Sequence, residues 1–462
     1  MDFWTVMPGG TVPAGEQAVT ESDSCDRIDA VFLRMPEPPR PPLLRAVGIF
    51  SLTAIAVNGM VGSGIFVLPA QVAKILGPAG LSAYLAAGLA AGLIVLCFAE
   101  VAALFDRSGG PYLYARAAFG DFIGFEIGWM TLLARLTAMA AISNAFSSYL
   151  GFFWPATASG MGRVLVISAA ITALTVINYR GVQYGTWVVN LLTVSKLAPL
   201  FVFIIAGLFF LAPDRPSAWT LPHPAGLQQA ALLLIFAFGG FEFAVVPGEE
   251  VVNPRRNLPI ALLTAIALVA VIYILIQFVA QGTLPDLATS STPLSSAGRR
   301  FLGPLGGVLL TAGAVFSTTG TNSALMLVTP RILFAMAEGG QLPAAMGRVH
   351  PRFRTPYVAI LITAVVGVAC AMYSQFASLA AISAIARLLS YMATCLALPV
   401  LRRKMPDAPR WFSVPGGPSI PIAALAISAW LLMGSTQNQI LISGGTLLAG
   451  AAVYGCYRLA RN

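Results

Sequence analysis

The chain has 462 residues, of which 57% are hydrophobic and only 10% charged, and its mean hydropathy is +0.81. Because soluble globular chains carry about 25% charged residues, this composition excludes an ordinary soluble protein and indicates a polytopic membrane protein. The net charge of +9 does not indicate a nucleic-acid partner, since most Lys and Arg residues lie in short loops between apolar spans. Five scattered cysteines and two histidines supply no metal-ligand spacing and no disulfide framework, so we expect neither a metal nor a cofactor.

Residues 1–45 form a polar segment rich in proline. Such a segment cannot bury enough apolar surface to order itself, so we expect a disordered cytoplasmic tail. It contains no apolar stretch of the kind found in a signal peptide.

From Val47 onward the sequence predicts an all-α membrane protein with twelve spans of about 20 residues, the length that a bilayer core requires. Positive charge gathers in the loops of one side, so both termini are expected in the cytoplasm, beneath a plasma (inner) membrane. We expect contact with membrane lipid and a monomer or homodimer. The expected spans are 47–76, 80–104, 122–152, 162–179, 185–211, 227–248, 258–281, 302–335, 356–373, 376–401, 420–435 and 440–458.

Glycines interrupt the first and sixth spans. Residues 58–66 read NGMVGSGIF, and residues 236–242 read FAFGGFE. Each glycine weakens a helix interior by about 1 kcal/mol, and broken backbone at membrane depth is tolerated only where it faces protein or a water-filled cavity. Two such spans in corresponding halves indicate a transporter built from inverted repeats, with its binding site at the breaks. Alternatively, these glycines serve only close helix packing.

Four stretches resemble signatures of the amino acid–polyamine–organocation superfamily of transporters. They are residues 62–69 (GSGIFVLP), 236–242 followed by 249–259 (EEVVNPRRNLP), 329–343 (TPRILFAMAEGGQLP) and 401–406 (LRRKMP). The resemblance runs from about residue 46 to the end. It implies the leucine-transporter fold, in which helices 1 and 6 are broken. Residues 46–211 would form the first five-helix repeat, residues 226–401 the second, and residues 415–459 two peripheral helices.

The resemblance also implies a set of binding residues. The backbone amides around Gly62, Ser63 and Gly64 would hold the carboxylate of an amino acid. The backbone carbonyls of Met60, Phe236, Ala237 and Gly239 would hold its amine, and Phe241 would be an aromatic gate. Relatives often carry a bulky aliphatic residue at the place of Gly239, so we expect a larger pocket here unless Met60 or Phe241 fills the space.

A charge at the bilayer centre costs at least about 2.5–3.5 kcal/mol, so each one needs a reason. Lys196 falls within the fifth span. In similar transporters a lysine at this place projects toward the unwound first helix, where sodium-coupled relatives bind Na⁺. Its ammonium would then replace the ion and could release a proton during the cycle. The alternative is a lysine that snorkels to an interface.

Three further charges fall within spans. Glu242 is either a proton carrier or a structural cap that accepts hydrogen bonds from the broken sixth helix. Arg135 either meets an acidic substrate side chain or, as we favour, pairs with Glu126 or backbone carbonyls. For Arg387 we expect only helix-end or interhelical hydrogen bonding.

Together these features predict a secondary transporter that carries an amino acid by alternating access and is not an enzyme. Proton coupling is the first expectation and amino acid exchange the second. A polyamine or other organic-cation carrier would need several acids in the pocket, where only Glu242 is available. A transport-inactive amino acid sensor is the alternative from a different class.

Overall fold

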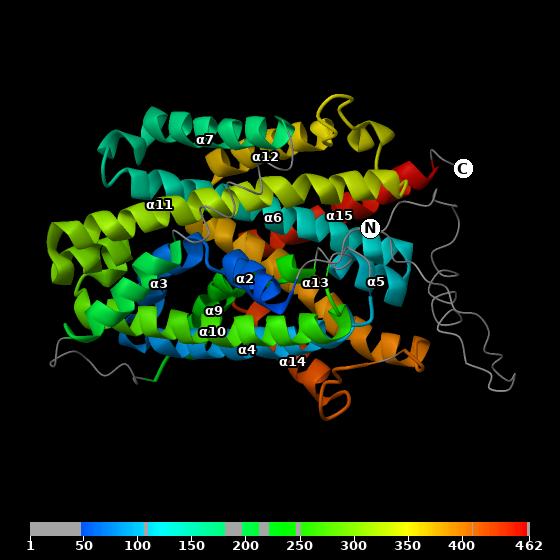
Figure 1. The fold of residues 1–462 in the computed structure, drawn as a ribbon, viewed down its shortest axis with the longest axis horizontal. Coiled ribbons are helices and arrows are strands. Elements are labelled where there is room, and N and C mark those ends of the chain that lie inside the picture. Colours follow the sequence, from blue (N-terminus) through cyan, green and yellow to red (C-terminus); the bar gives the residue numbers. More distant parts are fainter. Residues whose placement is uncertain are drawn as a thin grey trace, which may run out of the picture. The chain divides into compact units, whose positions relative to one another are not determined.

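The secondary-structure elements of the described part of the chain are all helices (Figure 1). The computed structural model describes residues 48–105, 110–180, 196–211, 221–245, 251–408 and 410–459. The predicted tail of residues 1–45, residues 185–195 of the fifth span and residues 246–248 of the sixth lie outside these ranges.

The α-helices follow one another along the whole described chain. They are α2 (Ile49–Met60), α3 (Ser63–Leu76), α4 (Gly80–Ala102), α5 (Pro111–Phe119), α6 (Asp121–Leu150), α7 (Gly160–Arg180), an unlabelled helix (Lys196–Leu208), α9 (Pro224–Phe238), α10 (Pro254–Thr283), α11 (Pro293–Glu338), α12 (Tyr357–Tyr373), α13 (Phe376–Lys404), α14 (Ser419–Leu432) and α15 (Gln437–Leu459). Short 3-10 helices lie at η1 (Gly77–Ala79), η2 (Pro155–Thr157), η3 (Phe241–Val245), η5 (Leu287–Thr289) and η6 (Ala344–Gly347).

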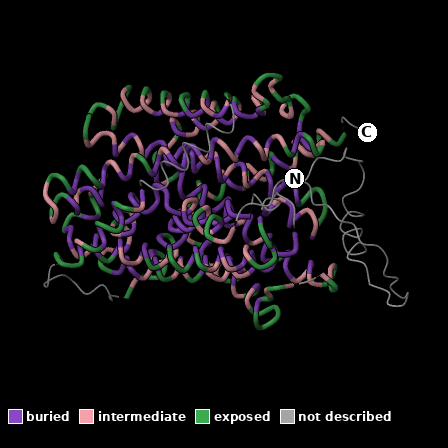
Figure 2. The backbone as a smooth tube through the Cα atoms, viewed as in Figure 1, coloured by how far each residue is buried: buried purple, intermediate pink, exposed green. Residues whose placement is uncertain are grey.

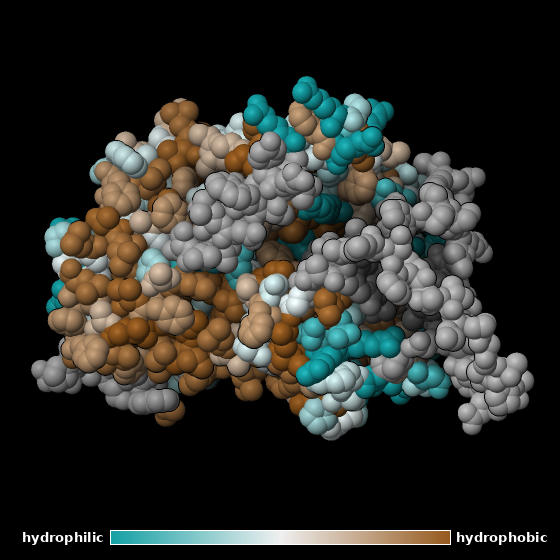
Figure 3. Space-filling model, in the orientation of Figure 1, coloured by the Kyte–Doolittle hydropathy of each residue, from teal (hydrophilic) through white to brown (hydrophobic). Residues whose placement is uncertain are grey.

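Length and hydropathy identify this as a membrane protein. Within the described ranges, eight helical segments are long and apolar enough to cross a bilayer, and four shorter apolar helices accompany them. Hydrophobic side chains cover most of the left and centre of the face in Figure 3, and hydrophilic ones gather toward its right. The expected all-α membrane class is therefore confirmed.

The interruption of the first span is confirmed. Helix α2 ends at Met60 and α3 begins at Ser63, and between them Gly62 has φ −119° and ψ −149°. The carbonyls and amides around this point leave the helical hydrogen-bonding pattern, as the glycine pattern predicted.

The interruption of the sixth span is confirmed as well. Helix α9 ends at Phe238, Gly239 is extended, and η3 follows from Phe241. Gly240 has φ +114°, a conformation that a residue with a side chain rarely adopts. The Gly239–Gly240 pair therefore lets the chain turn out of α9.

The eighth predicted span agrees with the longer part of α11. The backbone at Gly303, with φ 69°, is not helical, so α11 consists of two helices joined by a kink, and the second one covers the predicted residues 302–335. Pro304 follows Gly303 directly and lacks the N–H that would continue the helix. The shorter helix that begins at Pro293 was not predicted. Our pattern reading also missed α5, because its apolar stretch is too short to cross a bilayer.

The broken helices lie inside the bundle. Helices α2, α3 and α9 occupy its middle, beside α13 and between α10 and α6 (Figure 1). Buried residues gather on these inner elements, whereas α7 carries many exposed and half-buried residues (Figure 2). Helix α7 packs against α12. The two breaks are thus enclosed by protein, as broken backbone at membrane depth requires.

Candidate functional site

The two broken segments touch through glycines. A Cβ atom built on Gly59 would overlap with the carbonyl oxygen of Gly240, and one built on Gly240 would overlap with that of Gly59. At Gly64 a Cβ atom would lie 2.8 Å from the Cβ atom of Ala237. Close packing is therefore one reason for these glycines. Close packing does not exclude the expected role of these glycines in substrate binding, because the same backbone lines a pocket.

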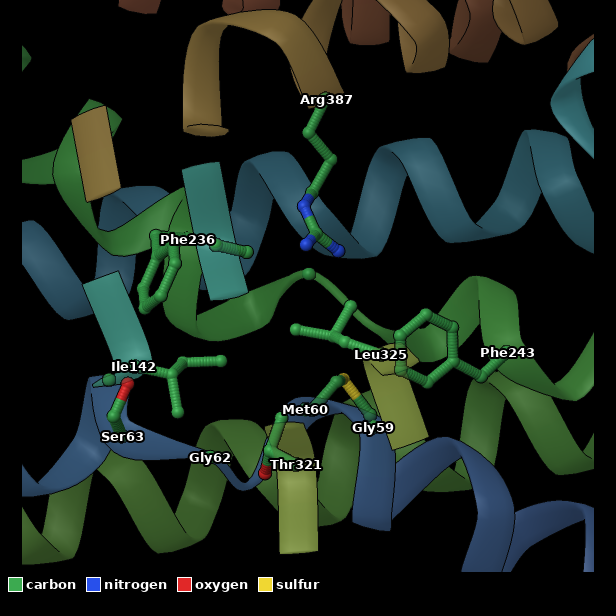
Figure 4. A pocket seen from close by; sticks show the side chains of 13 residues that line it. Gly59, Met60, Gly62, Ser63, Ile142, Phe236, Phe243, Thr321, Leu325 and Arg387 are labelled. Atoms are coloured by element: carbon green, nitrogen blue, oxygen red, sulfur yellow. The ribbon is translucent and has the colours of Figure 1, made fainter. Parts of the chain in front are cut away.

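This pocket lies between the two breaks, α6, α11 and α13 (Figure 4). Its cavity volume is about 20 Å³, room for about one water molecule. An amino acid enters only if the lining residues move apart. The lining residues are Gly59, Met60, Gly62, Ser63, Gly64, Ala138, Ile142, Phe236, Gly239, Phe243, Thr321, Leu325 and Arg387.

Most of the predicted binding residues meet at this pocket. Six of them line it: Met60, Gly62, Ser63, Gly64, Phe236 and Gly239. Ala237 lies behind Gly64. Phe241 is not among the lining residues and packs its ring against Phe98 and Tyr391, with centroids 5.1 and 5.0 Å away. Phe243 does line the pocket. The binding and gating roles of these residues stay predictions.

The start of α3 is suited to an anion. The first N–H groups of a helix have no partner within that helix, and they carry the positive end of the helix dipole. Ser63 is the first residue of α3, and its buried hydroxyl has no hydrogen-bond partner among the described residues. A carboxylate at this helix end would accept hydrogen bonds from both kinds of donor.

A tyrosine of α10 links the two breaks. The Tyr273 hydroxyl donates to the carbonyl oxygen of Met60 at 2.7 Å and lies 3.2 Å from that of Ala237. These are two of the carbonyls expected to hold the substrate amine. Tyr273 was not among the expected site residues, although a tyrosine within an apolar span indicates a hydroxyl that needs a partner.

Lys196 reaches the first break. Its side chain is fully buried, and its Nζ donates to the carbonyl oxygens of Asn58 at 2.7 Å and Val61 at 2.6 Å. The Ser317 hydroxyl also points at the Val61 carbonyl, at 3.4 Å. The snorkelling alternative is therefore wrong, and the ammonium stabilises carbonyls that α2 leaves unpaired.

Glu242 caps the sixth break. Its Oε2 accepts from the backbone N–H of Gly240 at 2.8 Å and from the Tyr391 hydroxyl at 2.7 Å. Its Oε1 pairs with Nη1 of Arg387 at 2.5 Å. The structural cap is thus present, and Arg387 makes the interhelical bond that we expected without knowing its partner.

Arg387 also changes the expectation for Gly239. A Cβ atom at Gly239 would lie 2.6 Å from Nε of Arg387, and it would overlap with the Cδ atom of the same side chain. The space left by the missing side chain is therefore filled by a guanidinium rather than by Met60 or Phe241. The expected enlargement of the pocket at this position is wrong.

The favoured pairing of Arg135 with Glu126 is wrong. Glu126 lies about two and a half turns earlier on α6, which places it on the opposite face of the helix. Its buried carboxylate has no hydrogen-bond partner in the described ranges and faces Gly450 of α15. The guanidinium of Arg135 lies over the ring of Phe243, 5.4 Å from its centroid.

Comparison with known proteins identifies the family of the chain. The profile of the family described as "Amino acid permease" matches residues 47–443. A methylthioribose transporter of Bacillus subtilis is 31% identical over 435 residues, which cover 90% of this chain and 94% of the relative. A branched-chain amino acid permease of the same organism is 28% identical over 437 residues (90% and 93%), and a serine/threonine exchanger is 30% identical over 431 residues (89% and 95%). The chain therefore belongs to the amino acid permease family, and it is a membrane transporter of amino acids or related solutes rather than an enzyme.

Proposed function

We propose that this protein is a secondary active transporter that moves an amino acid across the plasma membrane by alternating access, driven by protons and not by Na⁺. The observation that carries the proposal is the contact of the Lys196 ammonium with the Asn58 and Val61 carbonyls. An added Na⁺ about 4 Å away would meet a repulsion of about 4 kcal/mol at an effective dielectric constant near 20. That repulsion lowers affinity roughly a thousandfold.

Within this proposal the architecture is the leucine-transporter fold with twelve spans. Residues 46–211 and 226–401 form two inverted repeats, residues 415–459 form two peripheral helices, and both termini lie in the cytoplasm. The matching breaks at α2/α3 and α9/η3 support the repeat, because such interruptions fall at corresponding positions of two related halves.

The substrate lies across the two breaks in this proposal. Its carboxylate binds the amides of Gly62, Ser63 and Gly64 at the start of α3. Its amine binds the carbonyls of Met60, Phe236, Ala237 and Gly239, and Phe241 acts as the gate. Two observations support this placement: the Ser63 hydroxyl has no hydrogen-bond partner in the described ranges, and the Tyr273 hydroxyl already bonds two of these carbonyls.

Exchange of one amino acid for another is the second candidate, because one relative with matching coverage is a serine/threonine exchanger. A polyamine carrier has less support, since the pocket is lined by the cationic Arg387. Because one relative is a methylthioribose transporter, the test must also include methylthioribose, an uncharged solute.

The test is uptake by the purified protein in liposomes, with a panel of labelled amino acids and methylthioribose. Uptake is measured under one driving condition at a time: an imposed pH gradient, an imposed Na⁺ gradient, or unlabelled amino acid inside the liposomes. We expect uptake that follows the pH gradient and is the same in sodium-based and choline-based buffers. Uptake that requires Na⁺ contradicts the proposed coupling, and uptake only against internal amino acid assigns exchange.

A further inference from the structure

One wall of the pocket is a buried arginine. Arg387 points from α13 toward the turn between α9 and η3 (Figure 4), and it is only 6% exposed. One of its nitrogens, Nη1, is paired with Glu242. Its Nε lies beside Gly239, another residue of the pocket wall, and has no hydrogen-bond partner among the described residues. The wall therefore presents a guanidinium donor that is still unpaired.

A second arginine lies directly behind the wall. Arg135 precedes Ala138 and Ile142 on α6 by one and two turns, so all three share one face of that helix. Ala138 and Ile142 both line the pocket. Phe243 lines it too, and the guanidinium of Arg135 lies over the ring of Phe243. Arg135 is 5% exposed, and its Nε is without a hydrogen-bond partner in the part of the chain that the structure describes.

Among the residues that the structure describes, the charges around this wall do not balance. Arg135 and Arg387 contribute two positive charges, and Glu242 contributes one negative charge. A desolvated cation without a counter-charge is unfavourable, and a contact with an aromatic ring offsets only part of that cost. Lys196 adds no compensation, since it is a third cation, placed on the carbonyls of the first break.

We propose that the substrate supplies the missing negative charge, and that the pocket selects amino acids with a carboxylate side chain. This inference rests on the proposed amino acid transport. The backbone groups of the substrate bind the two breaks, and its side-chain carboxylate accepts a hydrogen bond from Nε of Arg387. Arg135 adds a second donor once the ring of Phe243 moves aside. Two guanidinium groups then face two carboxylates, whereas a neutral side chain leaves the buried donors unpaired.

The first test compares each acid with its amide, because glutamate and glutamine differ in charge but hardly in volume, as do aspartate and asparagine. The KM of each is measured with the full-length protein in liposomes, together with the melting shift that each ligand causes in detergent. We expect at least one acid to bind about ten- to hundredfold more tightly than its amide, the ratio for a charge-assisted hydrogen bond. Equal or better binding of both amides overturns the inference.

Variants locate the selectivity. Arg135→Gln should raise the KM for the acid about tenfold or more, so that the preference for the acid over its amide falls by at least that factor. Arg387→Gln alone would leave the buried Glu242 carboxylate without its ion-pair partner. The matched variant is therefore the double substitution Arg387→Gln and Glu242→Gln, which should lose the preference for the acid over its amide. Arg403→Gln, at an exposed position in the last turn of α13, is the control and should keep it.

The outcomes separate this inference from the proposed function. Transport of neutral amino acids without transport of either acid contradicts the inference and leaves the function standing. Failure to transport any amino acid under any gradient contradicts both. If the arginine variants do not fold, the comparison of acid with amide in the unaltered protein still decides the matter.

Discussion

The carboxylate of Glu242 and the guanidinium of Arg387, 145 residues apart in sequence, form a buried ion pair of 2.5 Å that joins the broken sixth helix to α13. The same carboxylate accepts hydrogen bonds from Gly240 and Tyr391. One side chain thus fixes the turn after α9, positions an arginine in the pocket wall and connects two helices of the proposed second repeat. A movement of α13 against the sixth helix would have to break or carry along this pair.

Removing one partner of this pair should destabilise the protein strongly. Glu242→Ala leaves Arg387 buried beside Arg135 without its counter-charge, a change that costs about 3–5 kcal/mol. We expect a marked fall in the melting temperature in detergent. The double substitution Glu242→Gln and Arg387→Gln should recover much of the loss, since no charge is left unpaired. Melting of the single variant at the normal temperature would show that the pair adds no stability.

The second prediction concerns Lys196. Lys196→Ala removes the ammonium donor from the carbonyls of Asn58 and Val61 and leaves only the Ser317 hydroxyl near the second of them. Uptake should therefore fall, and its dependence on pH should change. Lys196→Arg should restore little, because a guanidinium is larger and does not release its proton. Uptake is measured in sodium-based and choline-based buffers from acid to neutral pH. Normal pH dependence in Lys196→Ala contradicts the proposed coupling role. Lys74→Ala, in the last turn of α3, is the matched control.

The third prediction concerns the contact of the two breaks. Gly59→Ala places a methyl group on the carbonyl of Gly240, and overpacking of this kind costs about 1–3 kcal/mol or more. We expect lower stability and little uptake. Gly92→Ala on α4 is the matched control, because a Cβ atom there meets nothing within 4 Å. Equal uptake by the two variants would mean that the breaks are not held in contact during transport.

Tyr273→Phe supplies the fourth prediction. Loss of its hydroxyl leaves the buried Ala237 carbonyl without a donor among the described residues, which costs about 1–3 kcal/mol, and leaves the Met60 carbonyl with only the backbone N–H of Gly62. The empty protein should melt earlier, and a bound substrate should stabilise this variant more than the unaltered protein, since the amine replaces the lost donor. The control is Tyr84→Phe, because the buried hydroxyl of Tyr84 has no hydrogen-bond partner in the described ranges. If the substrate raises the melting temperature of Tyr273→Phe and of the unaltered protein equally, these carbonyls do not bind the substrate amine.

Local sequence was sufficient for some of these features. The glycines marked both breaks, because the preference of glycine for unusual backbone depends only on the residue itself. The family resemblance then placed Lys196 opposite the first break, and that placement is confirmed. Apolar composition and span length were likewise enough for the membrane class.

The remaining features depend on contacts between distant segments. Nothing near Arg387 in sequence indicates Glu242, and nothing near Tyr273 indicates Met60, which lies 213 residues away. The occupation of the space at Gly239 by Arg387 follows from the packing of α13 on the sixth helix, so a reading of the sixth span alone predicted an enlarged pocket instead. The wrong pairing of Arg135 with Glu126 was avoidable, because helical periodicity already separates their faces.

The small size of the central cavity has a consequence for the membrane itself. A leak of protons or ions through the protein needs a continuous file of water, and the cavity of about 20 Å³ has room for about one molecule. In this conformation the described residues around the breaks therefore leave no room for such a file of water between them. An idle carrier closed in this way does not discharge the gradient that would power its own uptake.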